Sequence, residues 1–102
     1  MKLEWTEPAL LDLECIRDHI KRDSEFYANR FVERIIEAVE GLEQFPEMGR
    51  WVPEAEAENI RELLFHSYRI IYRVETNIIL ILTVIHGARD LTRRIDKPWV
   101  VI

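Results

Sequence analysis

Three apolar runs in the second half of the chain constrain the fold most strongly. They are IRELLF (Ile60 to Phe65), YRIIYRV (Tyr68 to Val74) and IILILTVIH (Ile78 to His86). β-Branched and aromatic residues dominate these runs, as is typical of strands. Only two or three residues separate them, and turns this short force neighbouring strands to pair antiparallel. The sequence therefore predicts three consecutive antiparallel strands.

The first half of the chain carries the pattern of one short strand followed by two helices. Lys2 to Trp5 alternates between polar and apolar residues, and Thr6 is a suitable N-cap for a helix that ends near Asp23. A second helix begins at Asp23 or Ser24 and stops before Pro46, because the residue preceding a proline disfavours helix. The short break between them predicts an antiparallel helical hairpin.

The resulting order is β-α-α-β-β-β within a single domain of residues 1–102. It predicts an α+β fold, in which an antiparallel sheet packs against the N-terminal helical hairpin. The segment Pro46 to Asn59 (PEMGRWVPEAEAEN) carries two prolines, a glycine and four glutamates, which indicates a long loop.

Cysteine and apolar patterning predict a cytoplasmic protein. A lone cysteine, Cys15, allows no internal disulfide, fits a reducing compartment and is expected to be buried like most free cysteines. The start MKLEWTEP lacks the apolar stretch of a signal peptide. The run Ile78 to Ile85 is too short to span a bilayer, so we expect no membrane partner.

The residue pattern also predicts neither a metal nor a cofactor. His19, His66 and His86 fall on three different expected elements, without the paired spacing of metal ligands. With only three glycines, the chain has no glycine-rich phosphate loop.

Charge is distributed unevenly along the chain. Residues 1–58 hold seven Lys and Arg against 15 Asp and Glu, whereas residues 59–102 hold seven against four. The net charge of −5 therefore conceals a basic C-terminal part. Clustered cations are what phosphate-bearing partners require, whatever the total charge is.

The strand YRIIYRV predicts a sheet with two chemically different faces. Because side chains alternate along a strand, Arg69 and Arg73 share the face opposite to the tyrosines. A two-residue turn at His66–Ser67 sets Glu62 opposite Ile71, diagonally between the two arginines. Two readings follow: an ion pair on a solvated face, which is common, or a cationic surface that binds phosphate.

His86 ends the last expected strand, and Arg89 follows it closely. A histidine beside arginines could act as a general acid or base on an RNA 2′-hydroxyl or phosphate. It could equally be a half-buried residue at a strand end, since histidine is often intermediate in burial.

Three segments together resemble the RelE/ParE superfamily of toxins from type II toxin–antitoxin modules. They are LEQFPEMGR (Leu42 to Arg50), IRELLFHSYRIIYRVE (Ile60 to Glu75) and ILTVIHGARDL (Ile81 to Leu91). The resemblance implies a small antiparallel sheet with two N-terminal helices. It also implies a cognate antitoxin partner, and a target that is either DNA gyrase, in the ParE-type branch, or mRNA on the ribosome, in the RelE-type branch.

The resemblance also implies site residues. Arg69 and Arg89 match phosphate-contacting arginines of the RelE-type nucleases, and His86 matches a histidine that some of them place at that strand end. The lysines of the preceding strand are absent, with Ile60 and Glu62 near their positions, and so is the C-terminal tyrosine. The pattern is therefore closer to the ParE-type branch, whose members inhibit by binding and use no cofactor.

Further candidate contacts complete this interpretation. The target-binding arginines are expected at Arg61, Arg73, Arg93 and Arg94. The apolar stripe of the second helix is wider than one core face needs, and the chain ends on an apolar run. An antitoxin segment is therefore expected to contact Ile35, Ile36, Val39, Leu42 and Trp99.

The preferred function is thus a ParE-like gyrase inhibitor. The alternatives are a ribosome-dependent endoribonuclease that uses Arg69, His86 and Arg89, and a non-toxic interaction domain of the same fold.

Overall fold

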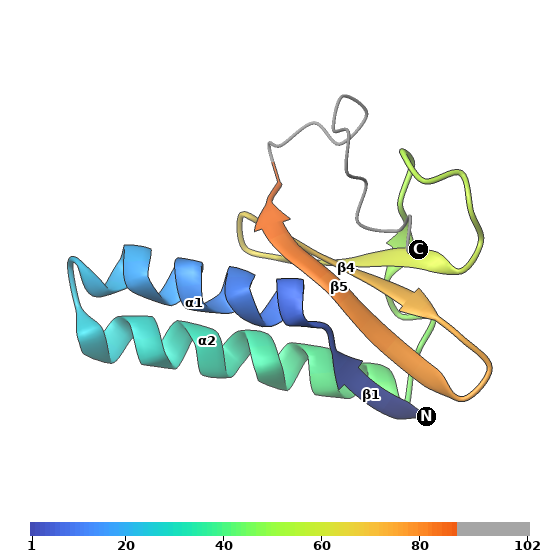
Figure 1. Cartoon of the computed structure of the whole chain (residues 1–102), viewed down its shortest axis with the longest axis horizontal. Helices are drawn as coiled ribbons and strands as arrows, with labels where there is room; N and C mark the ends of the chain where they lie inside the picture. Colours follow the sequence, from blue (N-terminus) through green and yellow to red (C-terminus); the bar gives the residue numbers. More distant parts are fainter. Residues whose placement is uncertain (88–102) are drawn as a thin grey trace.

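The computed structural model describes residues 1–87 and has the predicted α+β architecture (Figure 1). Two helices lie side by side on one face of a five-stranded sheet. The elements in chain order are β1 (Lys2–Trp5), α1 (Glu7–Lys21), α2 (Glu25–Glu40), the 3-10 turn η1 (Gly41–Glu43), β2 (Arg50–Trp51), β3 (Ile60–Phe65), β4 (Tyr68–Val74) and β5 (Ile78–His86).

Both predicted helix starts are confirmed. The side chains of Thr6 and Ser24 accept hydrogen bonds from the backbone N–H groups of Ala9 and Tyr27, which satisfies donors that the first turn leaves unpaired. Helix α2 ends at Glu40, and η1 continues the chain ahead of Pro46.

The sheet differs from the prediction at both edges. Its strand order is β1-β5-β4-β3-β2, and β1 pairs with β5 in parallel, so the sheet is mixed rather than wholly antiparallel. Strands β1 and β5 are far apart in sequence. They can pair because the chain leaves β1 along α1 and comes back along α2 before it forms the other strands. Strand β2 lies in the predicted loop, and its two residues are too few to show any periodicity.

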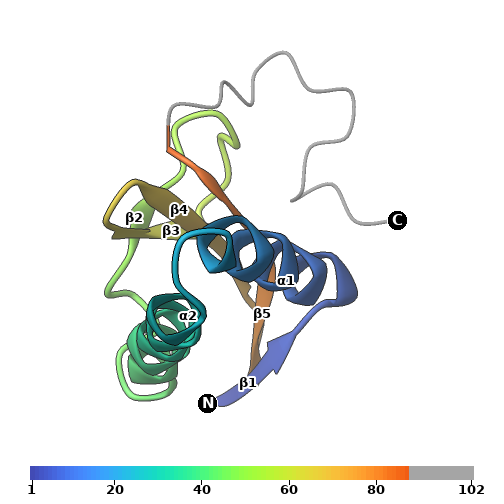
Figure 2. The same ribbon diagram turned by 90° about the vertical axis from the view of Figure 1, so that its left-hand side faces the viewer.

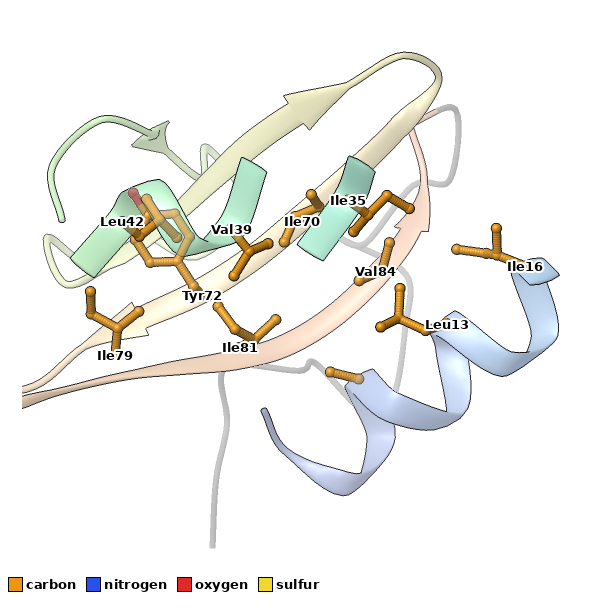
Figure 3. Close-up of a cluster of buried hydrophobic side chains, with 11 residues drawn as sticks. Leu13, Ile16, Ile35, Val39, Leu42, Ile70, Tyr72, Ile79, Ile81 and Val84 are labelled. Atoms are coloured by element: carbon orange, nitrogen blue, oxygen red, sulfur yellow. The ribbon is translucent and has the colours of Figure 1, made fainter. Parts of the chain in front are cut away.

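Figure 2 views the helices and the sheet after a turn of 90°. A hydrophobic core fills the space between them (Figure 3). Its buried members come from α1, α2, η1, β4 and β5, and include Leu13, Ile35, Leu42, Tyr72 and Ile81. A smaller cluster covers the opposite face of the sheet. It consists of Val52, Ile60, Ile71, Leu82 and Ile85.

A β-bulge in β5 shifts the facing of its last residues. Ile71 pairs with Thr83 but the next residue of β4 pairs with Ile81, so Leu82 has no partner in the register. Ile81 and Val84 both face the helices as a result, while Leu82 joins the opposite cluster.

Two polar side chains connect this bulge to helix α1: Asp12 within the helix and Thr6 at its N-cap. Asp12 Oδ2 accepts from Thr83 Oγ1 at 2.5 Å and from Val84 N at 3.0 Å. Thr6 Oγ1 donates to the carbonyl of Ile81 at 2.6 Å. The bulge is thus part of the helix–sheet interface.

Cys15 is exposed, which corrects the prediction of burial. The buried stripe of α1 runs through Ala9, Leu13 and Ile16, and Cys15 lies beside it. Among residues 1–87, no helix is both long and apolar enough to cross a bilayer.

Candidate functional site

The hairpin of β3 and β4 positions the candidate site. A two-residue turn, His66 and Ser67, joins the strands, and Glu62 stands opposite Ile71 as predicted. His66 adopts a left-handed φ of 52°. Such values are uncommon outside glycine, although histidine is among the residues that tolerate them better. The tight turn fixes the register and therefore which side chains share a face.

Four charged side chains form one network on the sheet face away from the helices. We call Arg50, Glu54, Glu62 and Arg69 the charge cluster. Arg69 Nε donates to Glu62 Oε1 at 2.6 Å, and its two terminal nitrogens donate to both oxygens of Glu54 at 2.9 and 2.8 Å. Arg50 Nε donates to Glu62 Oε2 at 2.7 Å. All three guanidinium nitrogens of Arg69 therefore already donate hydrogen bonds to carboxylates. This finding bears on both hypotheses for Arg69, the ion pair and the phosphate-binding surface.

The predicted pairing of Arg69 with Glu62 exists, but it is buried rather than solvated. The exposed fraction is 6% for Arg69 and 1% for Glu62. Hydrogen bonding to Glu54 raises the pKa of Arg69 above its ordinary value, against the burial that lowers it, and Glu62 adds to the increase. Two arginines face two carboxylates, so the charge cluster is neutral as a whole.

The segment FPEMGR is held in place by the hydroxyl of Tyr72. This hydroxyl donates to the carbonyl of Pro46 and accepts from the N–H of Gly49, each at 2.9 Å. A Cβ on Gly49 would lie only 2.5 Å from that hydroxyl. The FPEMGR segment, part of the family resemblance, therefore has a structural role in this protein. Its last residue, Arg50, belongs to the charge cluster.

A second group of side chains gathers on the helix-facing side of the same sheet end. We call Phe31, Phe65, His66, Tyr68 and His86 the aromatic cluster. The rings of Tyr68 and His86 meet edge to face with centroids 5.8 Å apart, and His66 lies 4.6 Å from Phe65. His86 thus has a tyrosine ring beside it, which comes from β4 and not from the C-terminal part of the chain.

The β5 bulge separates the two clusters. Tyr68 stands opposite His86, and Arg69 stands opposite Ile85. Tyr68 packs against the core under the helices, whereas Ile85 belongs to the cluster on the other face. His86 and Arg69 therefore project from opposite faces of the sheet.

An open cavity of about 610 Å³ wraps around this end of the sheet and touches residues of both clusters. Its charged and aromatic lining comprises Arg50, Glu54, His66, Tyr68, Arg69 and His86. Of these, Arg50, Glu54, His66 and Tyr68 were not expected in a site. Arg50 is the last residue of the FPEMGR motif, so the family resemblance was a signal that could have identified it. Nothing in the sequence indicated that Glu54 would contact Arg69.

The remaining predicted site residues have varied surroundings. Arg61 donates to the carbonyl of Gly49 at 2.7 Å, and its guanidinium lies 5.7 Å from the centre of the Trp51 ring. Arg73 pairs with Glu75 at 2.6 Å. Arg89, Arg93, Arg94 and Trp99 lie outside the described residues.

The expected antitoxin contacts on α2 and η1 need correction. Ile35, Val39 and Leu42 are 0% exposed within the core, so their side chains cannot meet a partner on the folded protein. The wide apolar stripe is needed because α2 packs against both α1 and the sheet. Ile36 is only partly buried and keeps some accessible surface.

Within residues 1–87, no three His, Cys, Asp or Glu side chains are grouped as a metal site would require. The described residues offer ionic and hydrogen-bonding groups. These groups come from the charge cluster on one face and from two histidines and a tyrosine on the other.

Comparison with known proteins gives consistent matches over most of the chain. A family model described as the ParE toxin of the type II toxin–antitoxin system parDE matches residues 3–91. The chain is 36% identical over 86 residues to the toxin RelE2 of Caulobacter vibrioides, covering 83% of this chain and 93% of that protein. It is also 36% identical over 88 residues to the putative toxin Y4kP of Sinorhizobium fredii, covering 84% and 88% respectively.

Two solved structures share the fold. The chromosomal ParDE toxin–antitoxin system from P. aeruginosa superposes with a TM-score of 0.72 at 30% identity, over 84% of this chain and 95% of that chain. The RelBE2 toxin–antitoxin complex from Mycobacterium tuberculosis superposes with a TM-score of 0.63 at 20% identity, over 83% and 95%. The second likeness concerns the fold alone.

Proposed function

The chain belongs to the ParE toxin family of type II toxin–antitoxin systems, and from this premise we propose that it inhibits DNA gyrase by binding it. The membership confirms the resemblance to the RelE/ParE superfamily and identifies the chain as a toxin component. In the proposed mechanism the protein stabilises gyrase on cleaved DNA, and a cognate antitoxin relieves the block.

The state of the charge cluster is the observation that carries this proposal. A nuclease of this size needs cations that contact the phosphate as negative charge develops in the transition state. Arg69, the main candidate, donates to two carboxylates, and Glu54 and Glu62 balance the charges of Arg50 and Arg69. This arrangement favours an inhibitor that works by surface complementarity.

A second candidate function is a ribosome-dependent mRNA endonuclease. The aromatic cluster favours it, because Tyr68 lies beside His86, His66 lines the same cavity, and these groups could share the two proton transfers that cleavage requires. Against it, the charge cluster lies on the other face of the sheet, and although one cavity touches both clusters, the charges of Arg50 and Arg69 are balanced by Glu54 and Glu62.

The two candidates are separated by assaying the same protein against both targets. One reaction holds purified gyrase, ATP and plasmid DNA, and the other holds ribosomes translating a defined mRNA. The proposal expects trapped gyrase cleavage complexes and intact mRNA. Codon-positioned cuts in the mRNA without gyrase complexes would replace it with the endonuclease.

The histidines provide matched variants for these assays. His86→Ala removes the acid–base candidate, and His19→Ala is its control because His19 is exposed on α1, away from the sheet end. Gyrase inhibition should survive both changes. An mRNA cleavage that only His86→Ala abolishes would identify His86 as catalytic.

A further inference from the structure

Strand β1 leaves one edge of the sheet unpaired. In the order β1-β5-β4-β3-β2 it is outermost, and no strand among the described residues pairs with its other side (Figure 1). An unpaired edge presents a row of N–H and C=O groups to which another strand can bind. We propose that this edge binds the β1 edge of a second copy of the chain, so that the two sheets join antiparallel about a two-fold axis.

The pairing of β1 with β5 shows which backbone groups are available to a second copy. Lys2 N donates to the carbonyl of Asn77 at 3.3 Å, so Lys2 and Glu4 direct their backbone groups to β5. Successive residues of a strand direct these groups to opposite sides. Leu3 and Trp5 therefore direct theirs outward, where no described strand accepts or donates a hydrogen bond.

Charge selects one register for the pairing of two copies. Hydrogen bonds form across the edge only where the outward residues of one copy lie opposite the outward residues of the other. Among the two-fold registers that meet this condition and overlap most of the strand, one sets Lys2 opposite Lys2 and one sets Glu4 opposite Glu4, and like charges directly opposite are destabilising. The remaining register centres on Leu3. In it the two Leu3 residues exchange both backbone hydrogen bonds, and each Lys2 lies opposite the Glu4 of the other copy.

The side chains of β1 fit this register on both faces of the sheet. Leu3 and Trp5 are half-buried on the face under the helices, where they pack against the main core. Lys2 and Glu4 are exposed on the opposite face, and no described residue forms an ion pair with either of them. The joined sheets would therefore have an apolar contact under the helices and two ion pairs on the other face.

The shortness of β1 sets the expected strength of the dimer. The strand has four residues, so the contact belongs to the small interfaces of weak and reversible complexes. We expect a dissociation constant between roughly 10 μM and 1 mM for the free protein. This inference does not depend on whether gyrase or mRNA is the target, because it concerns the protein alone.

The test is to exchange the two charges and measure the monomer–dimer equilibrium by sedimentation. Lys2→Glu sets like charges opposite each other twice in every dimer, so it should raise the dissociation constant at least about tenfold. The double variant Lys2→Glu/Glu4→Lys restores opposite charges across the edge with their order reversed, and it should return the dissociation constant to near the wild-type value. Recovery in the double variant is specific to the register in which residues 2 and 4 lie opposite each other.

Lys21→Glu is the matched control for Lys2→Glu. It makes the same charge change at an exposed position, and it lies at the end of α1, roughly 20 Å along the helix from the end that follows β1. The dissociation constant of this variant should stay near the wild-type value. Equal weakening by the two single variants would reveal a general charge effect and overturn the proposal, as would a double variant that does not recover.

Amide hydrogen exchange of the wild type locates the contact independently of any variant. The N–H groups of Leu3 and Trp5 should exchange more slowly as the protein concentration rises, whereas that of Glu4, which already faces β5, should be protected at every concentration. A dimer in which the exchange of Leu3 and Trp5 is unchanged would overturn the proposal. A protein that stays monomeric at about 1 mM would also overturn it and would leave the β1 edge to a strand of a different protein.

Discussion

Arg69 on β4 and Glu62 on β3 form a buried ion pair although they are not opposite each other in the register. Glu62 stands opposite Ile71, and Arg69 reaches it diagonally with an Nε–Oε1 distance of 2.6 Å. The side chains are 8% and 0% exposed. A loss of toxicity in an Arg69→Ala variant would therefore not by itself demonstrate a functional role, because the change also removes this buried ion pair.

Replacing Arg69 should destabilise the fold strongly. Arg69→Met leaves Glu54 without its bidentate partner and Glu62 with Arg50 alone, and breaking a buried pair from one side typically costs about 3–5 kcal/mol. Urea unfolding of both proteins measures the difference. Arg73→Met is the control, because its pair with Glu75 is more exposed and should cost about 0–1 kcal/mol. Equal losses in the two variants would contradict the assignment.

Gly49→Ala should be among the most damaging small substitutions in the chain. The added Cβ would lie 2.5 Å from the hydroxyl of Tyr72 and 2.6 Å from the carbonyl oxygen of Glu62, both inside the packed sheet. We expect a loss of about 1–3 kcal/mol, as overpacking usually gives. At Gly41 a Cβ would meet only the end of Met48 at 3.5 Å, so Gly41→Ala should be neutral or slightly stabilising. Thermal unfolding of the two variants makes the comparison.

Tyr72→Phe should lower stability and alter its dependence on pH. The change removes the partner of Gly49 N and of the Pro46 carbonyl, at about 1–3 kcal/mol. Burial raises the pKa of Tyr72 above its ordinary value near 10. Its stabilising contribution is thus complete below pH about 10 and declines as pH rises toward the higher pKa of the folded state.

The pH effect is read from the difference between proteins. Urea unfolding from pH 8 to 11 should show a steeper alkaline decline for the wild type than for Tyr72→Phe. Tyr27→Phe, at a position that is 58% exposed, should retain the wild-type decline. Parallel curves for all three proteins would show that Tyr72 does not titrate as proposed.

Asp12→Ala should loosen the β5 bulge. The variant leaves Thr83 Oγ1 and the buried Val84 N–H without their acceptor, a loss of about 1–3 kcal/mol. NMR should also show altered ring-current shifts where His86 meets Tyr68, because the bulge sets the facing of His86. Asp18→Ala, exposed on the same helix, should leave both stability and these shifts unchanged.

Local sequence rules predicted most of the scaffold. The two-residue turn at His66–Ser67 fixed the pairing of Glu62 with Ile71, because the loop length of a hairpin determines its register. Thr6 and Ser24 marked both helix starts, because their oxygens satisfy first-turn donors. These features depend on residues close together in sequence.

The missed features depend on contacts between distant segments. The parallel pairing of β1 with β5 joins residues such as Leu3 and Ile79, which no local pattern relates. The burial of Arg69 depends on Glu54, in the irregular segment between β2 and β3, and the placement of His86 beside Tyr68 depends on one unpaired residue, Leu82. Periodicity does not reveal where a strand gains an extra residue.

The bulge at Leu82 also limits what alignment can transfer between relatives. Side chains beyond it take the opposite facing from the one that strict alternation would give. A homologue without the extra residue would direct the residue aligned with His86 to the other side of the sheet. The same residue type at that position would then have unrelated roles in the two proteins. A one-residue insertion or deletion in β5, rather than a substitution, would be the evolutionary step that moves this side chain from one face of the sheet to the other.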